Sequence, residues 1–281
     1  LAAITTLAAR GELVLLDRLN HASLIDAAVL SGARFFRYAH ADPEAAQRRA
    51  AEATVIATDG VFSMDGDLAP LPALARVCRK AQAWFVVDDA HGLGVVGRTG
   101  RGTLEHFGMT SDDVPVLMGT LGKAFGTFGA FIAGSKDVIE LLIQKARSYI
   151  YTTAIPQPVA AAARTALEVS QEESWRRERV IALTRRFREA ARALQIPLAG
   201  TEFTPIQPIP CGTEHVALQA QDELLESGFC VVAIRPPTVP EGTARLRISL
   251  SAAHTEAEVD ALVEALDRVN RHLLRRELAT P

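Results

Sequence analysis

Lys123 lies in a glycine-rich stretch, Gly119-Thr-Leu-Gly-Lys-Ala-Phe-Gly126, that follows an apolar run. Because its neighbours are small or apolar, we expect the amine to be desolvated, and desolvation favours the neutral form of a lysine. A neutral amine can form a Schiff base. Taken alone, the glycines favour the simpler interpretation of a lysine in a glycine loop, since such loops usually lie at the surface.

Two carboxylates, Asp88 and Asp89, follow the apolar run Trp84-Phe-Val-Val87. Carboxylates at the end of a buried strand are costly unless a cation meets them. A helix cap or a metal site would satisfy them, but a site for pyridoxal 5'-phosphate (PLP) also explains Lys123. A PLP enzyme needs a Schiff-base lysine and an acid on the ring nitrogen. His91, three residues after Asp88, is then placed to hydrogen-bond the ring oxygen.

Three further side chains suit such a site. His21, in Asn20-His-Ala-Ser23, has a flat ring that could stack on the cofactor, although a lone histidine in a loop is more often structural. Ser63, in Val61-Phe-Ser-Met-Asp-Gly-Asp67, stands at a predicted strand end and could donate a hydrogen bond. Thr120 precedes Lys123 by three residues and could bind the phosphate. No Cys or His spacing typical of a metal site is present.

Two nucleotide-binding patterns are incomplete. Gly92-Leu-Gly94-Val-Val-Gly97 matches GxGxxG, but the glycines continue into Arg98-Thr-Gly-Arg-Gly102, which cannot begin a helix. The next strand also ends in Gly119 rather than in an acid. Gly122-Lys123 resembles the end of a P-loop, but Ala124 replaces the Ser or Thr that would hold magnesium. We therefore favour lysine chemistry over nucleotide binding.

The elements that position these side chains alternate along the first half of the chain. Short apolar runs predict strands at Leu13–Leu16, Val55–Thr58, Trp84–Val87, Val116–Met118 and Ala130–Ala133. Helical patterns lie between several of them, such as Pro43–Glu52 and Leu71–Lys80. This alternation predicts an α/β fold with a mostly parallel sheet covered by helices. Ligands bind such sheets at the carboxyl ends of the strands.

From about residue 158 the pattern changes to a smaller α+β domain, so we expect a large domain over residues 1–173 and a small one over residues 174–281. Helices are predicted at Pro158–Gln171, Val180–Leu194, Val216–Glu226 and after the capping-box residues Thr255 and Glu258. Strands are predicted at Ile206–Ile209, Val231–Ile234 and Leu246–Leu250. In the last strand Arg247 alternates with Leu246 and Ile248, which places it on the opposite face.

Composition limits the function classes. The chain has 281 residues, 22% of them charged, and a formal net charge of -3, so it has no basic field for nucleic acid. Its apolar runs are too short to span a membrane. Cys78, Cys211 and Cys230 lack metal spacing and no signal-peptide pattern is evident, so we expect free, buried thiols in a cytoplasmic protein.

Four segments together resemble the α-oxoamine synthases, a family of fold-type I PLP-dependent enzymes. They are Asn20–Ser23, Asp59–Asp67, Val87–Gly92 and Gly119–Lys123, and they occur in the family's order. The resemblance covers essentially the whole chain and implies the fold-type I PLP-dependent transferase architecture. Members have a further segment before the position of Leu1, with a glycine-aromatic stretch near the phosphate, so we expect a chain that lacks this N-terminal part.

Carried over position by position, the resemblance implies a role for each matching residue. Lys123 forms the Schiff base, Asp88 rather than Asp89 pairs the pyridine nitrogen, and His21 stacks on the ring and helps to hold the substrate. The resemblance also implies that His91 and Ser63 contact the ring hydroxyl and that Thr120 contacts the phosphate. Arg247 would bind the substrate carboxylate, with Arg245 as the alternative, and Thr238 would contact the substrate.

Within the family, Ala233–Pro240 and Gly242–Arg247 resemble the branch that condenses L-alanine with a pimeloyl thioester, releasing CO2 and CoA or carrier protein. In this reaction Lys123 would take the α-proton. Another α-oxoamine synthase such as glycine C-acetyltransferase, an ordinary aminotransferase and a non-catalytic fragment remain alternatives. Tyr149-Ile-Tyr-Thr-Thr153 resembles a family segment that reaches a neighbouring subunit, which implies a homodimer.

Overall fold

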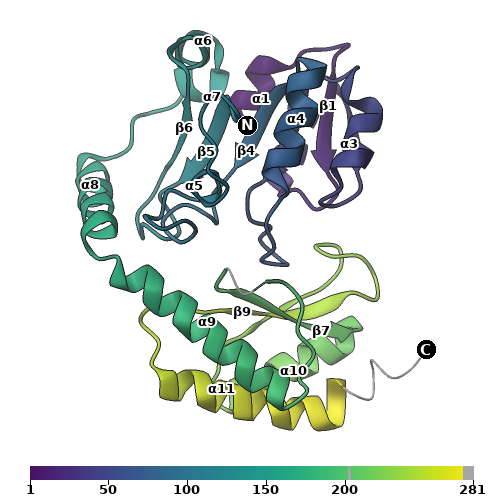
Figure 1. The fold of residues 1–281 in the computed structure, drawn as a ribbon, viewed down its shortest axis with the longest axis vertical. Coiled ribbons are helices and arrows are strands. Elements are labelled where there is room, and N and C mark those ends of the chain that lie inside the picture. The colour runs from purple at the N-terminus through teal and green to yellow at the C-terminus, as the bar shows by residue number, and fades with distance from the viewer. Residues whose placement is uncertain (202–203, 275–281) are drawn as a thin grey trace. The chain divides into compact units, whose positions relative to one another are not determined.

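The computed structural model describes residues 1–201 and 204–274. The chain forms two compact units (Figure 1). The first comprises Leu1–Phe62 and Leu68–Ser174, and the second comprises Ser63–Asp67 and the chain from Trp175 onward. The short segment Ser63–Asp67 therefore leaves the first unit between two of its elements and groups with the second. Each unit has hydrophobic core residues of its own.

A six-stranded sheet forms the centre of the first unit. Its strands are β1 (Leu13–Asp17), β2 (Arg34–Tyr38), β3 (Val55–Asp59), β4 (Trp84–Asp88), β5 (Val116–Thr120) and β6 (Ala130–Gly134). They are ordered β2-β1-β3-β4-β5-β6, and every neighbouring pair is parallel except β5 and β6. The predicted mostly parallel sheet is therefore confirmed.

Helices cover both faces of this sheet, because successive strand residues are apolar on opposite sides. In β1, Leu13 and Leu15 share a core with α3 (Pro43–Ala50) and α4 (Leu71–Ala81). Val14 and Leu16 share the other core with α1 (Ala2–Leu7), α2 (Ala22–Ser31) and α6 (Lys136–Lys145). The remaining helices of the unit are α5 (Thr103–His106), α7 (Arg147–Ile150) and α8 (Gln157–Glu172).

Several elements of the first unit have no counterpart among the predicted ones, and two of them, β2 and α2, show why. The strand β2 reads Arg-Phe-Phe-Arg-Tyr and buries only Tyr38, because it lies at the edge of the sheet. The helix α2 has His21 as its N-cap and ends at Gly32, where a φ of 74° suits a residue without a side chain. This helix matters for function because its first turn follows His21 directly.

The second unit is an antiparallel sheet packed against long helices. Its strands β7 (Ile206–Gly212), β8 (Val232–Ile234) and β9 (Ala244–Ser249) are ordered β7-β9-β8. Its helices are α9 (Trp175–Ala193), α10 (Glu214–Glu226) and α11 (Glu256–Val269), followed by the π-helical turn η1 (Asn270–Leu274). Thr255 and Glu258 form the predicted capping box at the start of α11.

No helix within residues 1–201 and 204–274 combines the length and the apolar character that a membrane span requires. The three cysteines are free, and Cys78 and Cys211 are buried as predicted. Cys230 is exposed instead, because it lies in the loop before β8.

Candidate active site at the carboxyl edge of the large sheet

Four parallel strands of the first unit end in polar residues at one edge of the sheet. Asp17, Asp59, Asp88 and Thr120 are the last residues of β1, β3, β4 and β5. Because these strands are parallel neighbours, their ends lie side by side, and Asp59 is paired directly with Asp88. The segments that follow all four strands carry predicted site residues.

Lys123 and His91 meet at this edge. Lys123 Nζ lies 2.7 Å from His91 Nε2, which is hydrogen-bonding distance. Lys123 is exposed, so the expectation of a desolvated amine is wrong. The loop after β5 closes on itself, with Leu121 N–H donating to Gly129 O at 2.8 Å and Thr127 N–H donating to Leu121 O at 2.9 Å. This closure leaves the lysine on the outside, where His91 contacts it.

Asp88 has an incomplete set of hydrogen bonds. It is 6% exposed, and its Oδ1 accepts a hydrogen bond from Ala90 N–H at 3.1 Å. Among the described residues, nothing donates to Oδ2. This oxygen therefore has room for one more donor, such as a protonated ring nitrogen.

Asp89 is enclosed by the protein. It is fully buried, and its Oδ2 accepts a hydrogen bond from Thr103 N–H at 2.8 Å. Burial raises the pKa of Asp89 to about 7. Gly60, Gly92 and Gly102 surround the carboxyl so closely that a Cβ on any of them would overlap it. Asp89 is therefore a structural residue, and Gly92 of the GxGxxG pattern serves close packing.

Thr120 stabilises the loop that carries Lys123 through two hydrogen bonds of its hydroxyl. Its Oγ1 donates to Gly129 O at 3.1 Å and accepts from Gly122 N–H at 3.3 Å. Both bonds stay within the loop. The contact of Thr120 with a cofactor phosphate remains a prediction.

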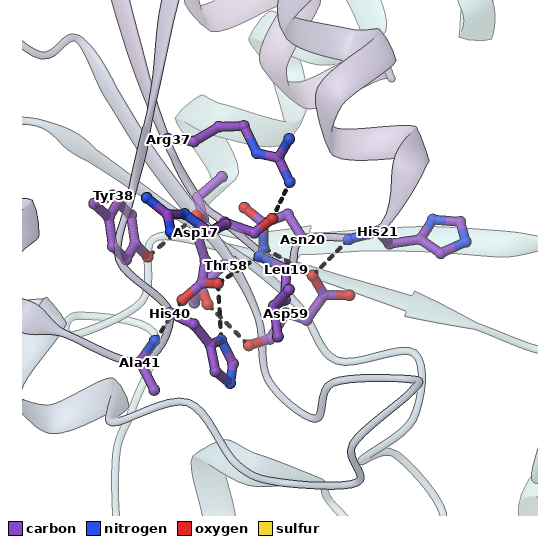
Figure 2. Close-up of polar contacts among 12 residues, drawn as sticks. Asp17, Leu19, Asn20, His21, Arg37, Tyr38, His40, Ala41, Thr58 and Asp59 are labelled. Carbon is purple, nitrogen blue, oxygen red and sulfur yellow. Dashed lines mark hydrogen bonds and ion pairs between the residues drawn. The ribbon is translucent and has the colours of Figure 1, made fainter. Parts of the chain in front are cut away.

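His21 lies next to a buried carboxylate (Figure 2). Asp59 Oδ2 accepts hydrogen bonds from His21 N–H at 2.9 Å and from Asn20 Nδ2 at 2.8 Å. Burial, followed by the nearby charge of Asp88, raises the pKa of Asp59 to about 7. His21 Nδ1 accepts from Ser23 N–H at 3.2 Å. Because a backbone N–H can only donate, Nδ1 is the acceptor and Nε2 carries the hydrogen of the neutral ring.

Asp17 organises the loops on the other side of Asp59. It is fully buried and accepts hydrogen bonds from Leu19 N–H and Ala41 N–H, both at 2.8 Å. Its Oδ1 also lies 2.9 Å from His40 Nδ1. Neither Asp17 nor Asp59 was assigned a role from the sequence. The sequence does contain a signal for both residues, because each follows a buried apolar run at the edge of the sheet where ligands bind.

The second unit holds three of the predicted site residues, which are Ser63, Thr238 and Arg247. Ser63 begins the segment Ser63–Asp67, and the Gly66 carbonyl of this segment accepts a hydrogen bond from Thr204 Oγ1 at 2.6 Å. Thr238 is exposed, and its N–H donates to Arg235 O at 3.1 Å in the turn after β8. Their contacts with a ligand remain predictions.

Arg247 and Arg245 differ in their partners. Both alternate with the buried residues Leu246 and Ile248, as the pattern predicts. Arg245 forms an ion pair with Asp65 of the same unit. Arg247 Nε is buried without a hydrogen-bond partner among the described residues, and burial lowers the pKa of its guanidinium. Arg247 thus keeps a donor for an anionic ligand, whereas Arg245 donates to Asp65 and to the Thr243 carbonyl.

Comparison with known proteins identifies the family. The family described as aminotransferase class I and II matches residues 1–266. The chain belongs to this family. The 8-amino-7-oxononanoate synthase of Thioalkalivibrio sulfidiphilus is 60% identical over 267 residues, which cover 93% of this chain and 68% of that relative. Further relatives with the same name are 54–58% identical, and the chain spans 68–71% of the length of these relatives.

Solved structures of the family have the same fold. A serine palmitoyltransferase variant from S. paucimobilis, solved with a bound PLP-myriocin aldimine, has a TM-score of 0.90 at 31% identity and covers 95% of this chain and 69% of its own. The 8-amino-7-oxononanoate synthase of Francisella tularensis has a TM-score of 0.87 at 31% identity, with coverages of 96% and 79%. The fold-type I architecture, the enzyme class and PLP as the cofactor are thereby confirmed.

The donor set at the edge of the sheet fits PLP. Lys123 offers an exposed amine for the aldehyde, and Asp88 Oδ2 offers an acceptor for the ring nitrogen. His21 offers a flat, exposed ring at the start of α2. The structure thus separates Asp88 from Asp89, which the sequence could separate only through the family resemblance.

Proposed function

We propose that the chain catalyses the decarboxylative condensation of L-alanine with a pimeloyl thioester, either pimeloyl-CoA or pimeloyl carrier protein. The products are 8-amino-7-oxononanoate, CO2 and free CoA or carrier, and the reaction belongs to biotin biosynthesis. The supporting observation is the contact of Lys123 with His91 beside Asp88, in a chain 60% identical to an 8-amino-7-oxononanoate synthase.

The cofactor contacts are assigned to residues at or just after the ends of strands. They pair the PLP aldehyde with Lys123, the ring nitrogen with Asp88, the ring face with His21, the ring hydroxyl with His91 and Ser63, and the phosphate with Thr120. When bound, PLP supplies a conjugated ring that accepts the electron pair left on the substrate α-carbon.

Lys123 is also the base that removes the α-proton of alanine, once the substrate amine has taken its place. An amine must be neutral to accept a proton. His91 Nε2 lies 2.7 Å from the lysine Nζ, and this contact holds the amine at the carboxyl edge of the sheet.

Arg247 binds the alanine carboxylate in this proposal, and Thr238 contacts the substrate. A guanidinium binds a carboxylate through two parallel hydrogen bonds, which fixes its orientation. The buried, unpartnered Nε of Arg247 supports this role. The Nε2–H of His21 is available to the thioester carbonyl oxygen, where negative charge develops during attack by the α-carbon.

A product assay with the purified, PLP-loaded chain tests the proposal. L-alanine and pimeloyl-CoA are expected to give 8-amino-7-oxononanoate, detected by its mass, with one CO2 per product, and Lys123→Ala is expected to give neither. Glycine and acetyl-CoA form the competing pair. Turnover of that pair alone would identify glycine C-acetyltransferase activity, and PLP binding without any turnover would favour a non-catalytic chain.

The active form in this proposal is a cytoplasmic homodimer. Tyr149, Ile150 and Tyr151 are 59%, 42% and 72% exposed, and α8 buries none of its residues, which leaves apolar surface for a second copy. The free cysteines suit a reducing compartment. Light scattering at micromolar concentration is expected to give twice the mass of one chain, and the mass of a single chain would contradict the dimer.

A further inference from the structure

We propose that Asp59 is a positioning residue that sets the direction of the His21 ring. The inference rests on the proposed function, which assigns His21 to the face of the PLP ring. Asp59 touches neither cofactor nor substrate in this arrangement. It acts through the backbone of His21 and the side chain of Asn20.

The carboxylate of Asp59 fixes the start of α2 from a different element. Asp59 ends β3 and is 3% exposed, and its Oδ2 accepts both the His21 N–H at 2.9 Å and the Asn20 Nδ2 at 2.8 Å (Figure 2). The N–H of an N-cap residue lies outside the helix ladder, and a side chain three residues along often accepts it. Here the acceptor comes from the sheet, so the position where α2 begins is tied to β3.

A second contact fixes the imidazole of His21. Its Nδ1 accepts from Ser23 N–H at 3.2 Å and lies 2.8 Å from Ser23 Oγ. The side chain turns about two bonds only, so a fixed backbone and a fixed Nδ1 leave its plane little freedom. Asp59 supplies the first of these constraints and Ser23 the second. Loss of Asp59 is therefore expected to release the ring even though Ser23 remains.

Both hydrogen bonds are accepted by the same oxygen of Asp59, so one substitution at Asp59 can either keep both or remove both. Asp59→Asn keeps one oxygen that can accept both, whereas Asp59→Leu has a similar size and no acceptor. If Asp59→Leu does not fold, Asp59→Ser takes its place in the experiment, because the serine hydroxyl is too short to accept the hydrogen bond from His21 N–H. Asp17→Leu is the matched control, since Asp17 is also a buried strand-end carboxylate but does not contact His21.

The first measurement is a double-mutant cycle on the PLP dissociation constant, read from the absorbance of the bound cofactor. Asp59→Leu and His21→Ala are each expected to weaken PLP binding about tenfold, the size of one ring-stacking contact. The double variant should be no weaker than either single one, and Asp59→Asn should stay near the original chain. The fold-change in the PLP dissociation constant caused by Asp17→Leu should multiply with the fold-change caused by His21→Ala when the two substitutions are combined. If the effect of Asp59→Leu multiplies in the same way, the proposal is overturned.

The second measurement uses the chain without PLP and follows the ring nitrogens of His21 by NMR. Asp59→Leu is expected to shift these signals, and Asp59→Asn is expected to leave them in place. Unchanged signals in Asp59→Leu would overturn the positioning role whatever the enzyme does. If His21→Ala leaves PLP binding unchanged, the assignment of His21 in the proposed function fails instead, and the ring signals still decide the role of Asp59.

Discussion

Lys123 is set apart from the other lysines by the loop that carries it. The other lysines are Lys80, Lys136 and Lys145, and they lie on α4 and α6. Lys123 instead follows the last residue of β5 and contacts His91. Among the four lysines, all of them in the described residues, Lys123 therefore combines a position just after a strand end with a histidine at hydrogen-bonding distance.

Borohydride reduction of the PLP-loaded chain is expected to leave a pyridoxyl label on the peptide that contains Lys123. Lys123→Ala should lose the label, because its side chain has no amine, and Lys136→Ala should keep it. Peptide mapping by mass spectrometry measures both. A label on Lys80, Lys136 or Lys145 in the original chain would contradict the assignment.

In the proposed function, Arg247 is the residue on which the substrate class depends, because it is assigned to the alanine carboxylate. Arg247→Ala is expected to weaken alanine binding by roughly 2–5 kcal/mol, the range for removing one partner of a buried charge pair. PLP binding should survive, because Lys123 and Asp88 are unchanged. Arg247→Lys should restore only part of the affinity, since an ammonium lacks the paired donors of a guanidinium. Titration of alanine against the cofactor absorbance measures these changes.

Arg245→Ala is the matched control for Arg247→Ala. Arg245 lies on the same face of β9, but Asp65 already pairs with it. Its removal should therefore change stability more than alanine affinity. An unaltered alanine dissociation constant in Arg247→Ala, together with a raised one in Arg245→Ala, would move the carboxylate site to Arg245.

The residue types of the site could be read from the sequence, but their surroundings could not. The alternation around Arg247 was predictable because strand side chains alternate over two residues. The exposure of Lys123 was not, since it depends on a loop closed by Gly129 and Thr127. The roles of Asp59 and Asn20 depend on a contact across 39 positions, which only the pairing order of the strands creates.

At the scale of elements, the predictable strands are those that an apolar run marks in the sequence. β1, β3 and β4 are almost wholly buried, so their residues form continuous apolar runs. β2 lies at the edge and exposes its first four residues, so no apolar run marks it. α2 was missed for a related reason, because its apolar residues do not follow a clear helical period.

The glycines between β4 and α5 are a further feature of element scale. Gly102 has φ 82° and ψ -159°, a conformation that side chains avoid, and a Cβ there would overlap Asp89. Gly102→Ala is expected to destabilise the fold by about 1–3 kcal/mol from backbone strain and by about 1–3 kcal/mol more from overlap. Denaturant unfolding followed by circular dichroism measures the loss.

Gly108→Ala is the control for this prediction. Gly108 also has a positive φ, but a Cβ added there would meet no atom within 4 Å. Its cost should stay at about 1–2 kcal/mol, the penalty for a left-handed residue alone. Equal costs for the two variants would mean that the packing around Asp89 tolerates a methyl group. The glycine pattern would then need another explanation.

For the whole molecule, the edge of the large sheet gathers several buried carboxyl groups. Asp17, Asp59, Asp88 and Asp89 are all at most 6% exposed. Burial raises the pKa of both Asp59 and Asp89 to about 7, whereas an exposed Asp has a pKa near 3.8. Folding therefore favours the protonated forms of these two groups.

The stability of the molecule should reflect this burial as the pH changes. A group with a raised folded pKa contributes stability that is complete below its unfolded pKa and is lost as the pH rises through the folded value. For Asp89 this window runs from about pH 4 to about pH 7. Asp89→Asn removes the titration, so it should gain stability relative to the original chain across this window, by at most about 1.4 kcal/mol per pH unit.

This gain is best measured as a difference in unfolding free energy between the variant and the original chain at each pH. Hydrogen bonds and charges lower the pKa of Glu258 and Asp260, which changes stability in the opposite direction but cancels in the difference. Asp112→Asn, at an exposed carboxylate, is the control and should give a nearly flat difference. If the Asp89→Asn difference is equally flat, Asp89 is ionised in the folded protein, and its enclosure by three glycines must then include a compensating donor.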